Sequence, residues 1–286
     1  MTDANSTVGT LSCLSSLALI TVSGADRFTF LQGQLTNDVT KLGNGLMPAG
    51  YCSPKGRLLA TPRLFQEGGT IGMIVAASNA DYLVKRLKMY VLRSKVTIER
   101  AADREVAGFV GALVFELPCA LPQARIAAAL PSGLGLAIVP KGTVCAGSEP
   151  LWWAACAAAG QSWVFGETAE RFTPHAVNLD LIGGISFNKG CYTGQEVVSR
   201  IEHIGKTNRR TVLLAANDPL ELAPGTDLTD TQGQVVATVL YGAKLADRTL
   251  LLAEVSTETA QSEAALDTTA ATLHRLPLPY GWTRNK

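Results

Sequence analysis

The stretch of sequence that decides the fold lies in the second half of the chain. It reads Lys189-Gly190-Cys191-Tyr192-Thr193-Gly194-Gln195-Glu196. Thr193 and Glu196 have the T-x-x-E spacing of a capping box, which predicts a helix that runs from Gln195 through Glu202. Cys191 then lies just before the positive end of the helix dipole and two residues from Lys189, and both features favour a thiolate.

The residues around Cys191 allow two interpretations. A single cysteine in a glycine-rich loop before a helix is a candidate nucleophile or redox thiol. Equally, Cys191 could be a small buried hydrophobic residue, with the glycines only shaping the turn. His175 and His203 are the nearest histidines in sequence, and neither has an obvious general-base position. Spacing alone leaves both interpretations open.

Hydrophobic periodicity upstream of this stretch predicts a mixture of strands, hairpins and single helices, which is an α+β pattern. The expected strands are Leu17–Val22, Arg57–Gln66, Ile71–Ala76, Lys95–Arg100, Val106–Leu117 and Gly135–Val139. The expected helices are Phe28–Leu35, Tyr82–Val91, Gln123–Leu130, which is rich in alanine, and the segment between Ser148 and Gly160. Ser23 with Asp26, and Ser78 with Asp81, have the S-x-x-D spacing of helix starts.

The chain changes character after Arg209, where short strands alternate with turns. The expected strands are Arg210–Ala215, Val235–Leu240, Thr249–Val255 and Thr272–Leu276. This pattern predicts a small β-barrel or sandwich.

The composition limits the classes of protein to which the chain can belong. It has 286 residues, of which 47% are hydrophobic and 17% charged, so a large core can form and a disordered chain or coiled coil is excluded. The 25 Lys and Arg nearly balance the 24 Asp and Glu. This balance argues against a protein that binds nucleic acid chiefly through charge, although it leaves room for one local basic site.

The cysteines and the apolar segments point to a cytoplasmic protein. None of the six cysteines forms a C-x-x-C pair and only three histidines exist, so a zinc or iron–sulfur site of the usual spacing is not expected. Scattered cysteines fit a reducing cytosol better than a secreted disulfide framework. No Lys or Arg precedes the apolar Leu11–Val22, which favours a strand over a signal peptide, and Pro150–Gly166 is too short to span a bilayer.

The octapeptide at residues 189–196 resembles the signature of the YgfZ family, whose members are folate-binding proteins related to the aminomethyltransferase (T-protein) of the glycine cleavage system. The resemblance covers most of the chain, in the same order as in the family. Its other blocks are Gly24–Asp26, Phe30–Asp38, Lys55–Arg57, Arg93–Val96, Gly183–Phe187 and Leu276–Tyr280.

The resemblance implies a three-lobed fold around a central channel that holds tetrahydrofolate. It implies a core at residues 1–205, made of two interleaved α+β lobes (1–56 with 146–205, and 57–145), and a C-terminal β-barrel at 206–286. It also implies a role in making or maintaining iron–sulfur proteins, including enzymes that thiomethylate tRNA. The expected partners are folate and iron–sulfur client or assembly proteins, without direct contact with nucleic acid or a membrane.

Several residues are candidates for the folate site. An indole face stacks on a pterin ring, and the resemblance places Trp152 near the folate, although Trp152 could equally be a core residue. Glu196 could accept two parallel hydrogen bonds from the pterin edge or serve only in the capping box. Gln195, Tyr192 and, on the first helix, Gln32 complete the expected folate contacts.

Three functions follow from these observations. The leading one is a tetrahydrofolate-binding accessory protein of iron–sulfur cluster assembly or repair, with Cys191 as reactive thiol and Lys189 as its electrostatic activator. An alternative is a one-carbon (aminomethyl) transferase with another acceptor. The transferases place an acidic residue after a Gly-rich turn, whereas Ser53–Leu59 has no carboxylate here. A plain folate-binding module with a structural Cys191 is the third.

Overall fold

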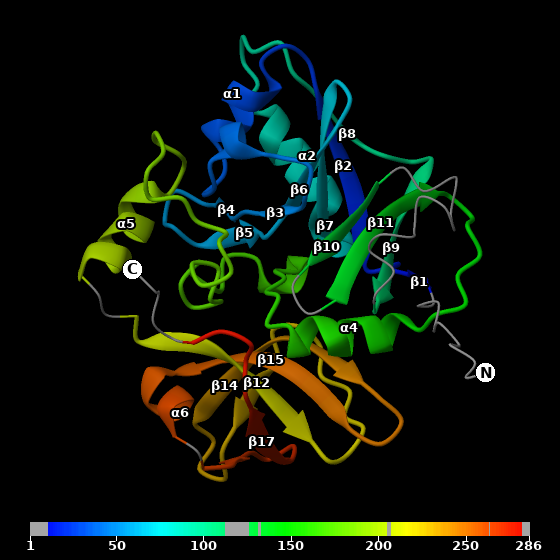
Figure 1. Cartoon of the computed structure of the whole chain (residues 1–286). Helices are drawn as coiled ribbons and strands as arrows, with labels where there is room; N and C mark the ends of the chain where they lie inside the picture. Colours follow the sequence, from blue (N-terminus) through cyan, green and yellow to red (C-terminus); the bar gives the residue numbers. More distant parts are fainter. Residues whose placement is uncertain (1–10, 112–125, 131–132, 205–206, 263, 282–286) are drawn as a thin grey trace, which may run out of the picture.

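Three larger antiparallel sheets and a separate two-stranded sheet make up the architecture of the described residues (Figure 1). The structure, a computed structural model, describes residues 11–111, 126–130, 133–204, 207–262 and 264–281. It is a three-lobed α+β fold, as expected, and each lobe contains one of the three larger sheets. No helix among these residues has both the length and the apolar character needed to cross a membrane.

The first sheet has five strands in the order β3-β6-β7-β2-β8. Their bounds are Met47–Pro48, Arg63–Glu67, Thr70–Ala76, Leu17–Ser23 and Thr97–Arg100. The apolar runs at the centre become β2 and β7, which pair along their whole length and confirm two predicted strands. Helix α2 (Ala80–Lys88) packs its apolar stripe of Ala80, Leu83 and Leu87 into this lobe.

The predicted strand Arg57–Gln66 is divided into two. Its first part, β5 (Leu58–Ala60), pairs with β4 (Tyr51–Cys52) in a separate two-stranded sheet. Its second part is β6, which forms the predicted hairpin with β7. Because β6, β7 and β8 share one sheet with β2, the expected lobe boundary near residue 57 falls within the first lobe.

The second sheet has the order β1-β9-β11-β10, with bounds Ser12–Cys13, Arg104–Val110, Leu134–Pro140 and Ile126–Leu130. The prediction of a helix at Gln123–Leu130 is wrong, because residues 126–130 form β10 and pair with all of residues 134–138 in β11. Alanine favours a helix locally, but strand pairing supplies the backbone hydrogen bonds and overrides that preference. The end of the predicted strand Val106–Leu117, after residue 111, lies outside the described residues.

The third sheet comprises the C-terminal strands in the order β13-β14-β15-β12-β17-β16. Their bounds are Asp227–Thr229, Val235–Lys244, Thr249–Ser256, Arg209–Ala216, Thr272–Leu276 and Leu266–Asp267. All four predicted strands of this region are confirmed. Short α6 (Thr257–Gln261) packs on β12 and β15, and the sheet forms the lower lobe in Figure 1.

Helix α4 (Glu149–Ala158) lies between the second and third sheets and contacts strands of both (Figure 1). Its tryptophans join an aromatic cluster: Trp153 lies 4.9 Å from Trp152 and 4.9 Å from Tyr241 of β14, measured between ring centroids. The Tyr241 hydroxyl donates to the Gln161 carbonyl oxygen at 2.6 Å. The lobes are therefore held together by one shared core rather than by a thin linker.

Two predicted helix starts differ from the observed ones. Ser23 ends β2, and Asp26 directs its carboxylate to the Lys95 backbone N–H at 2.7 Å before α1 (Arg27–Gln32) begins. Ser78 accepts from the Gly166 backbone N–H at 2.8 Å, so its hydroxyl serves another segment instead of capping α2. In both cases the side chain that was expected to cap the helix, Asp26 or Ser78, hydrogen-bonds a backbone N–H distant in sequence instead.

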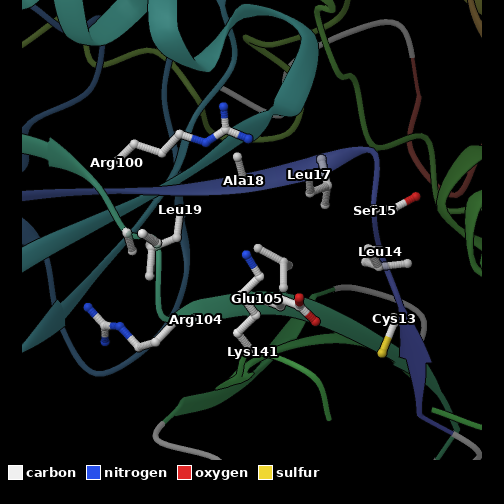
Figure 2. A pocket seen from close by; sticks show the side chains of 13 residues that line it. Cys13, Leu14, Ser15, Leu17, Ala18, Leu19, Arg100, Arg104, Glu105 and Lys141 are labelled. Carbon is white, nitrogen blue, oxygen red and sulfur yellow. The ribbon is translucent and has the colours of Figure 1, made fainter. Parts of the chain in front are cut away.

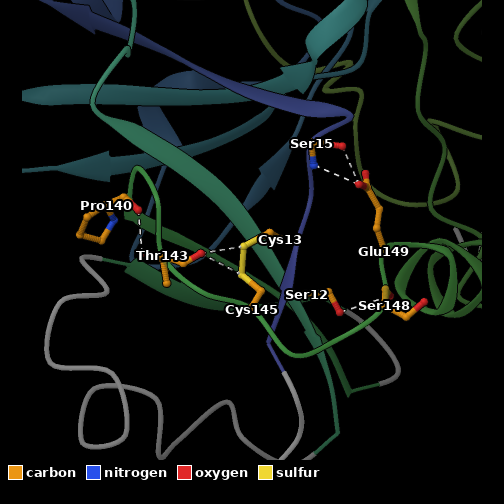
Figure 3. Close-up of a disulfide and its surroundings, with 8 residues drawn as sticks. All are labelled: Ser12, Cys13, Ser15, Pro140, Thr143, Cys145, Ser148 and Glu149. Atoms are coloured by element: carbon orange, nitrogen blue, oxygen red, sulfur yellow. Dashed lines mark hydrogen bonds between the residues drawn. A yellow bond between two sulfur atoms is a disulfide. The ribbon is translucent and has the colours of Figure 1, made fainter.

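A disulfide joins Cys13 of β1 to Cys145 before α4, across 132 positions of sequence (Figure 3). Leu11, the residue before β1, is tied to the same segment, because its carbonyl oxygen accepts from the Gly147 N–H at 2.8 Å. Cys13 and Cys145 are therefore not the free thiols that a reducing cytosol would maintain. The spacing gave no indication of this pair because the chain between the two residues spans two lobes.

Candidate functional site

The loop of residues 189–194 lies against the end of α1 and is fixed there by Lys189. The Lys189 ammonium donates to the carbonyl oxygens of Gln32, Leu35 and Asn37 at 2.7, 2.6 and 2.8 Å. Gln32 is the last residue of α1, and the final carbonyls of a helix have no partner within it, so a cation is favourable there. Leu35 and Asn37 belong to the segment that follows the helix. Lys189 thereby joins a segment of the N-terminal third of the chain to the loop of Cys191.

The environment of Lys189 limits what its charge can do for Cys191. Burial lowers the pKa of Lys189 from 10.5 to about 8, while the nearby Asp38 carboxylate opposes this shift. The ammonium also lies 5.1 Å from the centroid of the Tyr192 ring. An ammonium has three N–H donors, and the three carbonyls use all of them. Lys189 therefore has no hydrogen bond left for a thiolate and can act on Cys191 only through its charge.

The other side of the loop packs against the turn at Ser53–Arg57. Gly194 has φ +83°, and a Cβ there would lie 2.5 Å from the Ser53 carbonyl oxygen. Gly56 has φ +68°, and a Cβ there would lie 2.6 Å from the Cβ of Val197 in α5 (Gln195–Ile204). Both glycines are therefore required by the close approach of the two segments, in addition to their left-handed backbone.

Cys191 is exposed at the surface of this anchored loop, and its thiol is free. The other free cysteines among the described residues are Cys52 and Cys156, and both are fully buried. Burial raises the pKa of Cys52 to about 12 and that of Cys156 to about 11. Of these three thiols, only Cys191 is open to a reagent or partner. Cys119 lies outside the described residues.

The remaining predicted residues of the loop make local contacts. Gln195, rather than Glu196, turns back over the loop, since its amide oxygen accepts from the Tyr192 backbone N–H at 3.3 Å. The Glu196 carboxylate is 84% exposed and pairs with Arg200 one helical turn later at 2.7 Å. The Tyr192 side chain is buried, at 8% exposure.

Gln32 also has structural partners. Its amide group donates to the Asp38 carboxylate at 2.9 Å and accepts from the Val39 backbone N–H at 2.8 Å. Lys189 thus contacts both Gln32 and Tyr192 at the end of α1. These contacts assign none of the three residues a ligand.

Trp152 is placed elsewhere. It lies on α4, apart from the start of α5 in Figure 1, with 0% exposure and its indole N–H donating to the Gly135 carbonyl oxygen at 3.2 Å. A ligand can stack on this ring only if the covering side chains move.

A pocket of about 570 Å³ lies near this core, between β2 and β9 (Figure 2). Leu14, Leu17 and Val106 contribute apolar surface, and all three belong to the same hydrophobic cluster as Trp152. Its charged lining consists of Arg100, Arg104, Glu105 and Lys141. Sequence reasoning missed this pocket, because its lining comes from three separate segments without a common motif.

A second group that the sequence did not reveal is His175, Asp180 and Glu202, whose ligand-type atoms lie within 4.8 Å of one another. Burial lowers the pKa of His175 below 6.5, and its Nε2 lies 3.3 Å from a Glu202 carboxylate oxygen. However, Arg210 binds both Asp180 carboxylate oxygens, at 2.7 and 3.1 Å. A guanidinium in this position opposes a metal cation, so the group fits an ion-pair link between core and C-terminal lobe better than a metal site.

The fold itself is that of the T-protein. A crystal structure of the glycine cleavage system aminomethyltransferase T from Bartonella henselae superposes with a TM-score of 0.68. It covers 95% of this chain and 86% of that protein at 15% sequence identity, so it shows the fold alone.

The sequence comparisons define the family more closely. The tRNA-modifying protein YgfZ of Yersinia pestis (strain Pestoides F) is 31% identical over 97% of this chain and 94% of its own length. The protein of the same name from Shigella boydii serotype 4 (strain Sb227) is 33% identical over 95% of this chain and 93% of its own. The chain therefore belongs to the YgfZ family of tRNA-modifying proteins. No protein-family model matches it.

Proposed function

We propose that this chain binds tetrahydrofolate and supports the assembly or repair of iron–sulfur proteins, including enzymes that modify tRNA, with Cys191 as its reactive thiol. The observation that carries the proposal is the accessibility of Cys191. It is an exposed thiol on a loop fixed at both ends, whereas Cys52 and Cys156 are fully buried. A fixed position and an open approach are what a thiol needs to meet a partner protein reproducibly.

The relatives' name and the fold support the two halves of this proposal. The YgfZ relatives are named for tRNA modification, which agrees with a role beside tRNA-modifying enzymes. The T-protein fold is that of an enzyme of folate chemistry, which agrees with a folate ligand. The transferase alternative is less favoured, because Leu58 and Leu59 are buried in β5 at the place where a transferase would need a carboxylate.

The proposed folate contacts fall into two sets. The first is the loop set, Gln32, Tyr192, Gln195 and Glu196, in which the exposed Glu196 carboxylate would bind the pterin edge after releasing Arg200. The second is the pocket between β2 and β9, where apolar walls suit the ring and Lys141 suits the carboxylates of the glutamate tail (Figure 2). For the pterin to stack on Trp152, the side chains of the hydrophobic cluster that contains both Trp152 and the apolar pocket lining would have to move.

A titration with reduced folate tests the proposal and separates the two sets. Binding should quench the tryptophan fluorescence of the wild-type protein and release or absorb heat in calorimetry. Glu196→Gln should weaken binding if the loop set is correct, and Lys141→Gln if the pocket is correct. Lys244→Gln on the C-terminal lobe is the control and should have no effect. Absence of both quenching and heat for the wild type would refute folate binding.

A further inference from the structure

Helix α2 and the turn that follows it form a local basic surface that the overall charge conceals. Residues 82–98 contain Lys85, Arg86, Lys88, Arg93 and Lys95 and no Asp or Glu. Removing these five from the 25 Lys and Arg of the chain leaves 20 against 24 Asp and Glu. The near-zero net charge is therefore the sum of this basic segment and a mildly acidic remainder, and the segment is complementary to a polyanion.

These cations lie at the surface around an aromatic stripe. All of them except the half-buried Arg86 are exposed. The Arg86 guanidinium lies between the rings of Tyr82 and Tyr90, which precede and follow it by four residues. It donates to the Tyr82 hydroxyl at 3.4 Å and lies 6.0 Å from the centroid of the Tyr90 ring. Tyr82 is 46% and Tyr90 38% exposed. Ala80, Leu83 and Leu87 pack into the core. Beside this buried face the Tyr82 and Tyr90 rings are exposed, whereas the half-buried Arg86 also hydrogen-bonds the buried Tyr51.

Acidic groups next to this surface are already engaged. Asp81 pairs with Arg100 at 2.9 Å, and Asp26 accepts from the backbone N–H of Lys95. Met89 and Leu92 add exposed apolar area beside the stripe, at 64% and 89% exposure. Leu92 holds φ +45°, a conformation that is unfavourable for a leucine and gains no burial in return.

We propose that the α2 surface (Tyr82, Lys85, Arg86, Lys88, Tyr90, Arg93 and Lys95) binds RNA through its phosphates and unpaired bases. Planar aromatic and guanidinium groups stack unpaired bases, and lysines neutralise the phosphates beside them. An acidic protein is the less favoured partner, because lysine is depleted from protein–protein interfaces. The inference goes beyond the proposed function, on which it rests only for its biological role. It differs from the expectation that the chain makes no direct contact with nucleic acid.

The α2 surface lies close to the loop of Cys191, because the two contact opposite ends of α1. Lys95 is bound to Asp26 at the start of α1, and Lys189 is bound to the carbonyls at the end of α1. Helix α1 has six residues and is therefore about 9 Å long. An RNA on the α2 surface, at the top of the view in Figure 1, would lie one short helix away from the loop of Cys191.

Fluorescence anisotropy of the full-length protein with labelled total tRNA, at about 50 and about 200 mM KCl, tests the proposal. Lys85→Gln with Lys88→Gln should weaken binding and reduce the slope of log K against log salt by about 1.4, since each phosphate contact to a single strand contributes about 0.7. The control is Lys244→Gln with Arg248→Gln, which removes the same charge from exposed positions of the C-terminal lobe. It should bind tRNA like the wild type.

The aromatic stripe is tested separately. Tyr82→Leu with Tyr90→Leu should weaken binding about fivefold or more, because stacking on bases is lost. Tyr82→Phe with Tyr90→Phe keeps the rings and should bind within about twofold of the wild type. All variants change exposed side chains, and circular dichroism verifies that each remains folded.

Three results would overturn the RNA proposal: no binding of tRNA at the lower salt, equal loss in the Lys244/Arg248 control, or full binding by the leucine variant. The last result would indicate a surface that recognises apolar area and charge, as an acidic protein partner would. Folate titration of the same variants should be unchanged. Loss of tRNA binding is therefore distinguishable from failure of the proposed folate function.

Discussion

The anchoring of the Cys191 loop by Lys189 can be tested through stability. Lys189→Met keeps the length of the side chain and removes three hydrogen bonds to carbonyl oxygens. Hydrogen bonds from a charged group contribute about 1.5–3 kcal/mol each, or roughly 4.5–9 kcal/mol if additive. Burial, which lowers the pKa of Lys189 to about 8, opposes this contribution. We therefore expect a net loss below this additive range, of about 3 kcal/mol, at neutral pH.

The assay is thermal unfolding of Lys189→Met beside Lys55→Met, which removes an exposed lysine from the neighbouring turn. A loss of about 3 kcal/mol lowers Tm by roughly 6–12 °C in a protein of this size, whereas the control should be unchanged. Since the folded-state pKa of Lys189 is below its unfolded value, the unfolded chain binds more protons between about pH 8 and 10.5. The wild type should therefore gain stability relative to Lys189→Met in that window. Equal Tm values for the two variants, or a difference that shrinks at alkaline pH, would refute the reasoning.

Three other predictions concern stability. Replacing Cys13 and Cys145 by serine should lower the free energy of unfolding by up to about 5 kcal/mol, because the disulfide closes a loop of 132 positions; dithiothreitol should lower the Tm of the wild type but not of this variant. Gly194→Ala should lower the Tm measurably, because residue 194 has φ +83° and the new Cβ would clash with the Ser53 carbonyl oxygen. Gly190→Ala should leave the Tm unchanged, because no atom lies within 4 Å of its Cβ. Equal effects of the two substitutions would contradict the packing described. The wild type should lose stability as pH falls below 6.5, because burial lowers the pKa of His175 in the folded state and the unfolded chain takes up the proton first. His175→Gln should lose less stability over the same pH range. Parallel stability–pH profiles of the two proteins would exclude this contribution of His175.

Much of the fold follows from local patterns. Strands β2, β7 and β11 and the C-terminal strands were predictable because apolar and β-branched runs bounded by turns specify buried strands. Strand β10 was not, because Ile126–Leu130 has a composition that favours a helix and becomes a strand only by pairing with β11. The partner strand β11 begins only four residues later, at Leu134, so the preference of the alanines for a helix, and not a distant partner, misled the prediction.

The site was predictable in its location and less so in its chemistry. The octapeptide singled out Cys191 but left open whether its side chain is buried, and the structure shows that it is exposed. It did not show that the Lys189 ammonium is committed to three carbonyls of a segment about 150 positions earlier in the chain. The disulfide and the pocket between β2 and β9 were missed for the same reason, since both depend on residues that only the folded chain brings together.

The central claim is that Cys191 is the working thiol of this protein. The most direct test is to measure the activity of iron–sulfur enzymes that modify tRNA in cells whose own copy of the chain is replaced by Cys191→Ser, at matched levels of folded protein. The side chain is exposed, so the serine variant should fold as well as the wild type. We expect that tRNA modification falls to the level of cells without the protein. Full modification in the serine variant would contradict the claim and leave Cys191 without a functional role.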